Sequence, residues 1–221
     1  MLDAIHPDLP NPARDTNTYT LGSIGSHNIV IACLPKGRHG TTSAAVAATQ
    51  MINTFPSIRV GLIVGISSGI PSKVRLRDVV VSTPIDQYPG VVQWDMGKAE
   101  GGNGCFKRTG ALNNPRSTLL TALIVPKFTN SNSLEDPSSD PGVSERETRI
   151  HYGLIVSGNQ VVKDASMEAA GLVNSFPCVV IRGIADYCDL HKDKDWQEFA
   201  AAVAAAYAKE LLQCVQQIEI E

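Results

Sequence analysis

The sequence lacks the long apolar segments that cross membranes. Among its 221 residues, no stretch approaches the roughly 18 uninterrupted apolar residues of a membrane-spanning helix. Residues 1–7 have neither the basic start nor the apolar core of a secretory signal. We therefore expect a cytoplasmic chain that makes no use of a membrane.

Charge of either sign is also scarce. Only 19% of the residues are charged, and 19 Lys and Arg against 22 Asp and Glu leave a net charge of −3. Such a chain has no broad electrostatic attraction to nucleic acid or to an anionic membrane. We expect a small-molecule partner instead. The 43% of hydrophobic residues are enough to form one core, so we expect a single domain to bind this partner.

Paired cysteines and metal-ligand spacings are missing as well. The five cysteines are an odd number without any CxxC pair, and the histidines show no ligand spacing such as HExxH. This pattern favours buried thiols in a reducing compartment and no metal site. The cysteines are Cys33, Cys105, Cys178, Cys188 and Cys214.

Turn residues and apolar patterns divide the first third of the chain. Three prolines in residues 1–18 indicate an irregular lead-in, and residues 19–34 predict two strands joined by a tight turn. Residues 41–52 begin with hydroxyl side chains and are rich in alanine, which predicts an N-capped helix. Residues 60–66 are apolar without alternation, which favours a strand covered on both faces.

Strands continue to alternate with helices in the remainder. The apolar residues of the last helix, from about Lys194, recur every three or four positions and line one face. A polar segment near 128–148 reads as a mobile insertion. The alternation of strands and helices, together with the hairpin, predicts an α/β fold with a mixed sheet, in one domain over residues 19–221. Further strands are expected at 78–82, 90–95, 150–158 and 177–184, and a short helix at 167–174.

Polar, glycine-bearing residues follow three of the expected strands. They are Gly65–Gly69, Ser157–Gln160 and Arg182–Tyr187. Ligands of open α/β sheets bind beyond the carboxyl ends of strands, so these segments form one candidate site. The alternative is that the glycines only serve ordinary turns.

Two carboxylates stand out near these strand ends. Asp186 directly follows an apolar strand, where poor hydration disfavours its charge and suits it to donate a proton; it could equally cap the last helix. Glu168 lies among small residues, where a buried carboxylate requires partners such as sugar hydroxyls. A buried salt bridge between Glu168 and Arg182 is the alternative.

The segment before the first helix is a candidate anion site. Lys36, Arg38 and the hydroxyls of Thr41 and Thr42 come together at a helix N-terminus, whose free N–H groups attract anions such as phosphate. Alternatively, the hydroxyls only cap the helix and the two cations are solvated.

These segments together resemble the nucleoside phosphorylase and nucleosidase superfamily, which includes the purine nucleoside phosphorylases, uridine phosphorylases and methylthioadenosine/S-adenosylhomocysteine nucleosidases. The resemblance is strongest to the N-terminal domain of fungal NOD-like receptors. It covers about residues 1–215, and Met167–Gly171 followed by Arg182–Tyr187 is its most specific part. The other matching segments are residues 19–22, 30–35, 40–45, 64–66, 78–82, 90–95 and 151–160.

The resemblance implies a three-layer αβα fold and cleavage of the N-glycosidic bond between ribose and a purine. Asp186 would protonate the base, Met167 would pack under the sugar, and Glu168 would bind its hydroxyls. The segment Gln160, Val161 and Val162 would contact the base, with aliphatic Val161 where related nucleosidases have an aromatic ring.

The attacking group would lie on the other side of the sugar. Its candidate residues, for water or phosphate, are Ser67, Ser68, Gly69, Thr41, Thr42 and Arg38. The resemblance implies no cofactor, although inorganic phosphate would be a co-substrate of a phosphorylase. It also implies self-association into a homo-oligomer.

The sequence departs from this superfamily at two points. Members begin with another strand, which ends in groups that orient water or phosphate, and they carry about a dozen or more further residues before the methionine. Three functions therefore stay open: a purine nucleosidase acting on adenosine-like nucleosides or nucleotides, a phosphate-dependent purine nucleoside phosphorylase, and an inactive purine-sensing or assembly module.

Overall fold

The computed structural model describes residues 2–37, 40–100, 105–124, 148–158, 173, 176–187 and 195–216. The expected helix at 167–174 and the insertion near 128–148 lie wholly or almost wholly outside these ranges. Within the described ranges, no helix is both long and apolar enough to cross a bilayer. In the same ranges, no three His, Cys, Asp or Glu side chains gather where a metal ion could be held.

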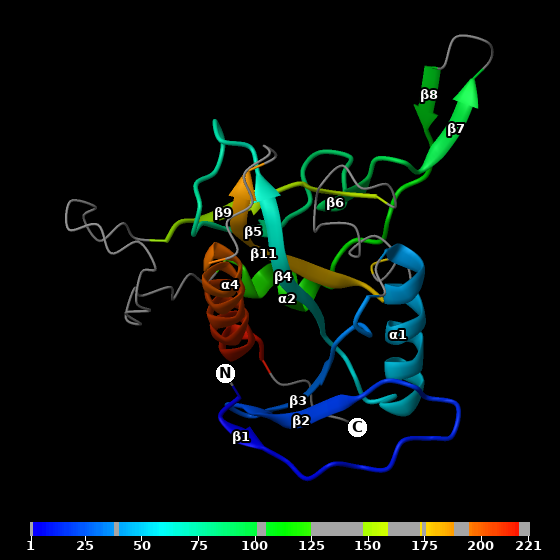
Figure 1. Ribbon diagram of the computed structural model, residues 1–221, viewed down its shortest axis with the longest axis vertical. Coiled ribbons are helices and arrows are strands. Elements are labelled where there is room, and N and C mark those ends of the chain that lie inside the picture. Colours follow the sequence, from blue (N-terminus) through cyan, green and yellow to red (C-terminus); the bar gives the residue numbers. More distant parts are fainter. Residues whose placement is uncertain are drawn as a thin grey trace.

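The N-terminal part forms a small antiparallel sheet, at the bottom of Figure 1. Strand β2 (Tyr19–Ile24) pairs with β3 (His27–Ala32) across a two-residue turn that contains Gly25 at φ 55°. This confirms the predicted hairpin. The lead-in contains a two-residue strand, β1 (Ala4–Ile5), which pairs with β2.

Helix α1 (Thr41–Thr54) confirms the predicted helix and buries its small side chains Ala44, Ala47 and Ala48. The expected hydroxyl cap is wrong. Gly40 occupies the N-cap position at φ 91°, and no side chain caps the helix. A glycine reaches this left-handed conformation without steric cost, so the chain turns into the helix through its backbone.

The main sheet has the order β4-β11-β5-β9. Strand β11 (Cys178–Tyr187) pairs parallel with β4 (Gly61–Gly69) and antiparallel with β5 (Val79–Ser82), which in turn pairs parallel with β9 (Ile150–Gly153). The predicted mixed sheet of an α/β fold is thereby confirmed.

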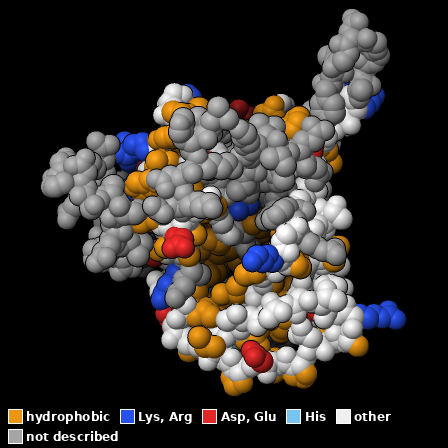
Figure 2. Space-filling model, in the orientation of Figure 1, with side chains coloured by type: hydrophobic (Ala, Val, Ile, Leu, Met, Phe, Trp, Pro, Cys, Tyr) orange, Lys and Arg blue, Asp and Glu red, His pale blue; other side chains and the backbone are white. Residues whose placement is uncertain are grey.

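Strand β4 differs from its prediction because it is only partly covered. It lies at the edge of the main sheet, and Val64 in its middle is 38% exposed. Figure 2 shows a hollow lined mainly by hydrophobic side chains between α1 and α4 (Asp195–Cys214), where β4 passes. An apolar run thus indicated a strand correctly, but not full burial of both faces.

The predicted strand at 150–158 is divided between two sheets. After Gly153 the chain leaves β9 and forms β10 (Ile155–Ser157), which pairs parallel with β6 (Val91–Gln93). Besides β1, three short elements were not predicted: the hairpin of β7 (Gly97–Glu100) and β8 (Cys105–Arg108), and helix α2 (Ser117–Ala122).

Two hydrophobic clusters cover the two faces of the central strands. On one face, Val179 and Ile181 of β11 pack with α2 and with α4, whose buried residues confirm the predicted apolar stripe. On the other, Cys178 and Val180 pack with Val91 and Ile155 of β6 and β10. Strand β11 therefore lies at the centre of the core.

The cysteines are only partly as expected. Cys178 is buried, and its burial raises the pKa of the thiol to about 12, so it is inert. Cys214 is half-buried and Cys33 is exposed, which corrects the expectation of burial for Cys33. All three are free thiols.

We expect Gly183→Ala to destabilise the protein, because α4 lies directly against the backbone of β11. A Cβ atom at Gly183 would overlap the carbonyl oxygen of Ala200 in α4. Displacing a packed helix costs about 1–3 kcal/mol or more, which urea unfolding would measure. Gly153→Ala is the matched control, because a Cβ there has no neighbour within 4 Å. Equal unfolding midpoints for the two variants would contradict this account of the packing.

Candidate functional site

The carboxyl ends of β4 and β11 lie side by side, at the top of Figure 1. The register pairs Ile184 with Ser67, Asp186 with Ser68, and Tyr187 with Gly69. Two of the three expected strand ends are therefore brought together. The residues Ser67, Ser68 and Gly69, which follow the strand expected at 60–66, belong to β4 itself, because backbone pairing with β11 continues through them.

A β-bulge turns the chain at this edge. The register shifts between Ile184 and Asp186, so Ala185 is an extra residue in β11 with no partner in β4. Bulges bend a strand and redirect the side chains that follow, and they are frequent beside functional sites. Asp186 is the first residue after this bulge.

Asp186 is buried but incompletely hydrogen-bonded. Its residue is 8% exposed, and its Oδ1 atom has no hydrogen-bond partner among the described residues. Nearly all buried polar groups in proteins have a partner, so an unpartnered carboxylate oxygen marks a position that a ligand can complete. Asp186 is therefore buried, as expected directly after an apolar run, and it lies within β11 rather than at a helix cap; its role as an acid stays a prediction.

The third strand end lies in the other sheet. Strand β10 ends at Ser157, and Gly158 packs against the indole of Trp94, whose ring would overlap any Cβ at that position. Asn159 and the predicted base-contacting residues Gln160, Val161 and Val162 lie outside the described residues. So do Arg38, Met167 and Glu168.

The two candidate hydroxyls of α1 differ in exposure. Thr41 is buried at the start of the helix, whereas Thr42 is exposed. Ser67 on β4 is also buried. The phosphate or water site is therefore divided between two elements, and its assembly stays a prediction.

Arg182 is a buried cation in the middle of β11. It is 3% exposed, and its guanidinium lies over Gly65 of β4, where any Cβ would overlap Nη1. Gly65 thus makes room for the arginine within the sheet. Whether Glu168 pairs with Arg182 lies outside the described residues.

A second buried carboxylate, Asp78, was not singled out from the sequence. It is 1% exposed and directly precedes β5. Its Oδ1 accepts hydrogen bonds from the Arg149 amide (3.1 Å) and the Arg75 guanidinium (3.1 Å), and its Oδ2 accepts them from the Arg75 amide (3.0 Å) and His151 Nε2 (2.7 Å). Its donors come from two segments far apart in the chain, so no local sequence signal reveals it.

The hydrogen bonds decide the ionisation of Asp78. Burial raises the pKa of this carboxyl, but the bonds from the Arg75 amide, His151, the Arg75 guanidinium and the Arg149 amide outweigh burial and lower the pKa below its usual value. Asp78 is therefore an ionised carboxylate with satisfied oxygens.

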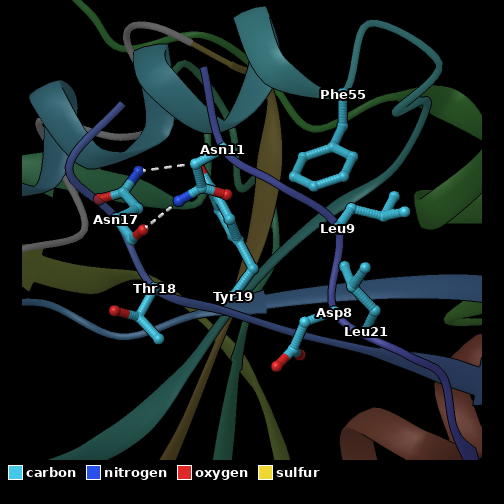
Figure 3. A pocket seen from close by; sticks show the side chains of 8 residues that line it. All are labelled: Asp8, Leu9, Asn11, Asn17, Thr18, Tyr19, Leu21 and Phe55. Atoms are coloured by element: carbon cyan, nitrogen blue, oxygen red, sulfur yellow. Dashed lines mark hydrogen bonds between the residues drawn. The ribbon is translucent and has the colours of Figure 1, made fainter. Parts of the chain in front are cut away.

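A separate cavity lies at the other end of the molecule, between the lead-in, β2 and the end of α1. Figure 3 shows Leu9, Leu21 and Phe55 on one side of it and Asn11 and Asn17 on the other. Its volume of about 190 Å³ is below the roughly 300 Å³ at which small-molecule sites begin. It is therefore not the site of a nucleoside-sized ligand.

Curated proteins are similar to this chain in sequence. A nucleotide-binding leucine-rich repeat (NLR)-like protein of Hyaloscypha variabilis is 43% identical over 273 residues, which cover 96% of this chain and 27% of the relative. The ATP nucleosidase Cap17 of Escherichia coli is 24% identical over 200 residues, 79% of this chain and 39% of the relative. The chain thus spans less than half the length of either relative. No family model matches it.

Solved structures show the same fold. The 5′-methylthioadenosine/S-adenosylhomocysteine nucleosidase of Neisseria meningitidis, in complex with methylthio-immucillin-A, has a TM-score of 0.66 at 18% identity, covering 96% of this chain and 91% of that one. The futalosine hydrolase of Helicobacter pylori has a TM-score of 0.67 at 18% identity, covering 96% and 89%.

We expect Asp78→Asn to lower the free energy of unfolding at neutral pH by at least about 2 kcal/mol, because amide donors lose a charged acceptor. The folded pKa of Asp78 lies below its unfolded value near 3.9, so its contribution is present above that value and is lost as the pH falls through the folded pKa. The difference between wild type and variant should therefore narrow below about pH 4.

Urea unfolding at a series of pH values checks this expectation. Asp8→Asn, at an exposed carboxylate of the lead-in, is the control and should change stability by less than about 0.5 kcal/mol. A difference between wild type and Asp78→Asn that stays constant into strong acid would contradict the ionised state of Asp78.

Proposed function

Because the chain has the fold of the nucleoside phosphorylase and nucleosidase superfamily, we propose that it is a purine nucleosidase. It hydrolyses the N-glycosidic bond of adenosine-like nucleosides or nucleotides and releases the base. The single observation that carries this proposal is Asp186, a buried carboxyl group with an unpartnered oxygen directly after a bulge.

Asp186 acts as the general acid. A purine leaves as a poor anion unless it is protonated, and a carboxyl group within hydrogen-bond reach of the base can supply that proton. The sugar then passes through an oxocarbenium-like transition state, as in glycoside hydrolysis, which nearby negative charge stabilises. Water attacks the anomeric carbon from the opposite side, becomes the sugar hydroxyl and releases its other proton to solvent.

The remaining roles follow the superfamily resemblance. Glu168 binds the ribose hydroxyls, Met167 packs under the sugar, and Gln160, Val161 and Val162 contact the base. Ser67, Ser68 and Gly69 adjoin Asp186 through the pairing of β4 with β11, which supports them as part of the same site. The resemblance assigns them to the side from which water approaches. Self-association of the chain belongs to the same proposal.

One relative supports nucleotides among the substrates. The Escherichia coli relative is named an ATP nucleosidase, which supports ATP as well as adenosine as a substrate here. The NLR-like relative supports a further reading, in which this chain is a purine-sensing module of a longer protein. Such a module binds purine nucleosides or nucleotides without cleaving them.

We expect release of adenine from adenosine or ATP without added phosphate. Incubation with adenosine, inosine and ATP, with and without phosphate, followed by identification of the sugar product, tests this expectation. Ribose 1-phosphate that forms only with phosphate would make the protein a phosphorylase, with Thr41, Thr42, Ser67 and Arg38 holding the anion. Binding without any cleavage would favour the sensing module.

We expect Asp186→Asn to abolish base release, because an amide cannot donate the proton. Substrate binding should stay within about tenfold, since the amide keeps the size of the carboxyl group. Turnover assays and isothermal calorimetry measure the two effects, and Asp8→Asn at the other end of the molecule is the matched control. Wild-type turnover in Asp186→Asn would remove this residue from the mechanism.

A further inference from the structure

We propose that Asp78 is a positioning residue for Asp186. It acts through the turn Arg75–Asp78, which holds the bulged end of β11 in place. This inference rests on the proposed function, because it concerns the geometry of the proposed acid.

The turn Arg75–Asp78 has a strained backbone. The Asp78 amide donates to the Arg75 carbonyl (3.2 Å), and Arg77 at the third position has φ 79°. This is the geometry of a type II turn, whose third residue is usually glycine. An arginine in the left-handed region persists only where the surroundings hold it. Here the Asp78 carboxylate closes the turn by accepting the Arg75 amide (3.0 Å).

The same turn is hydrogen-bonded to β11 on both sides of the bulge. The Ile184 amide donates to the Asp78 carbonyl (2.9 Å), and the Arg77 amide donates to the Ile184 carbonyl (3.1 Å). Beyond the bulge, the Leu76 amide donates to the Tyr187 hydroxyl (3.3 Å). Ala185 and Asp186 therefore lie between Ile184 and Tyr187, the two residues of β11 that hydrogen-bond to the turn.

Strand β4 fixes the opposite edge of this segment. There Asp186 pairs with Ser68 and Tyr187 with Gly69. The position of the Asp186 carboxyl group therefore depends on β4 on one side and on the turn on the other. Because a displacement of about 1 Å at a reacting group can cost on the order of 100-fold in rate, a loosened turn should lower the rate of base release.

The donor groups that face the Asp78 carboxylate come from its own turn and from the neighbouring strand with the residue before it. The charged group is the Arg75 guanidinium; the His151 imidazole of β9 and the Arg149 amide complete the set of hydrogen-bond donors. The carboxylate thus joins the turn to β9 as well as closing it. Asn at this position loses one acceptor oxygen and places an NH2 group among these donors.

The experiment compares Asp78→Asn with Asp15→Asn in the wild-type background. Asp15 is a matched carboxylate, because it accepts hydrogen bonds from the Asn17 amide (3.0 Å), the Tyr19 hydroxyl (2.7 Å) and the Thr54 hydroxyl, all near the lead-in. Both variants should unfold at lower urea concentration. At a temperature where both are folded, only Asp78→Asn should lower kcat, by about 10- to 100-fold, with KM within about threefold.

Tyr187→Phe tests the contact between the turn Arg75–Asp78 and the end of β11 without disturbing the core. It removes the acceptor of the Leu76 amide and keeps the ring, so the protein should fold even if Asp78→Asn does not. We expect kcat to fall about three- to tenfold while the urea midpoint changes little.

Hydrogen exchange of peptides from β11 should become faster in Asp78→Asn and stay unchanged in Asp15→Asn.

The outcomes separate this inference from the proposed function. A wild type that releases no base overturns the proposed function, and the inference with it. If the wild type is active, an unchanged kcat in folded Asp78→Asn, or in Tyr187→Phe where Asp78→Asn does not fold, overturns the inference alone. Equal losses of kcat in Asp78→Asn and Asp15→Asn would overturn it too, because general destabilisation would then explain both.

Discussion

The structure depends on the pairing of β11 with two strands of opposite direction. β4 lies parallel to it and β5 antiparallel, so its backbone groups are satisfied from both edges while its two faces carry the two hydrophobic clusters. A strand in this position has little freedom to shift, because a slip of one residue would exchange its two faces. The end of β11 is therefore a firm support for a functional group.

The close approach of α4 follows from the same constraint. Gly183 brings the backbone of β11 against Ala200 of α4, and Gly65 leaves space for the guanidinium of Arg182. Because neither glycine has a side chain, the backbone of α4 and the Arg182 guanidinium can lie close to the sheet at these positions. Beyond them the regular pairing gives way to the bulge at Ala185. The site thus begins where the most tightly packed part of the fold ends.

The sequence predicted the long elements well because their apolar periodicity is local. The hairpin, α1, β11 and α4 were all found in this way. The ends of β4 and β11 were not, because polar and glycine residues look like loops, although Ser67–Gly69 and Asp186–Tyr187 continue the backbone pairing. The division of residues 150–158 between two sheets depends on which strands lie beside them. The sequence of residues 150–158 alone does not indicate these long-range partners.

The candidate site was predicted to a similar extent. Asp186 stood out because an acidic residue directly follows an apolar run. Asp78 did not, since an acidic residue before a strand is common and its donors Arg149 and His151 lie far along the chain. The contrast between the two carboxylates is informative. Both are buried near the same end of β11, yet Asp78 has partners on both oxygens, whereas Asp186 leaves Oδ1 without one. An unsatisfied buried group costs about 1–3 kcal/mol, and a fold that satisfies Asp78 so fully could have satisfied Asp186 too. That difference is the physical reason why we propose a structural, positioning role for Asp78 and a chemical role for Asp186.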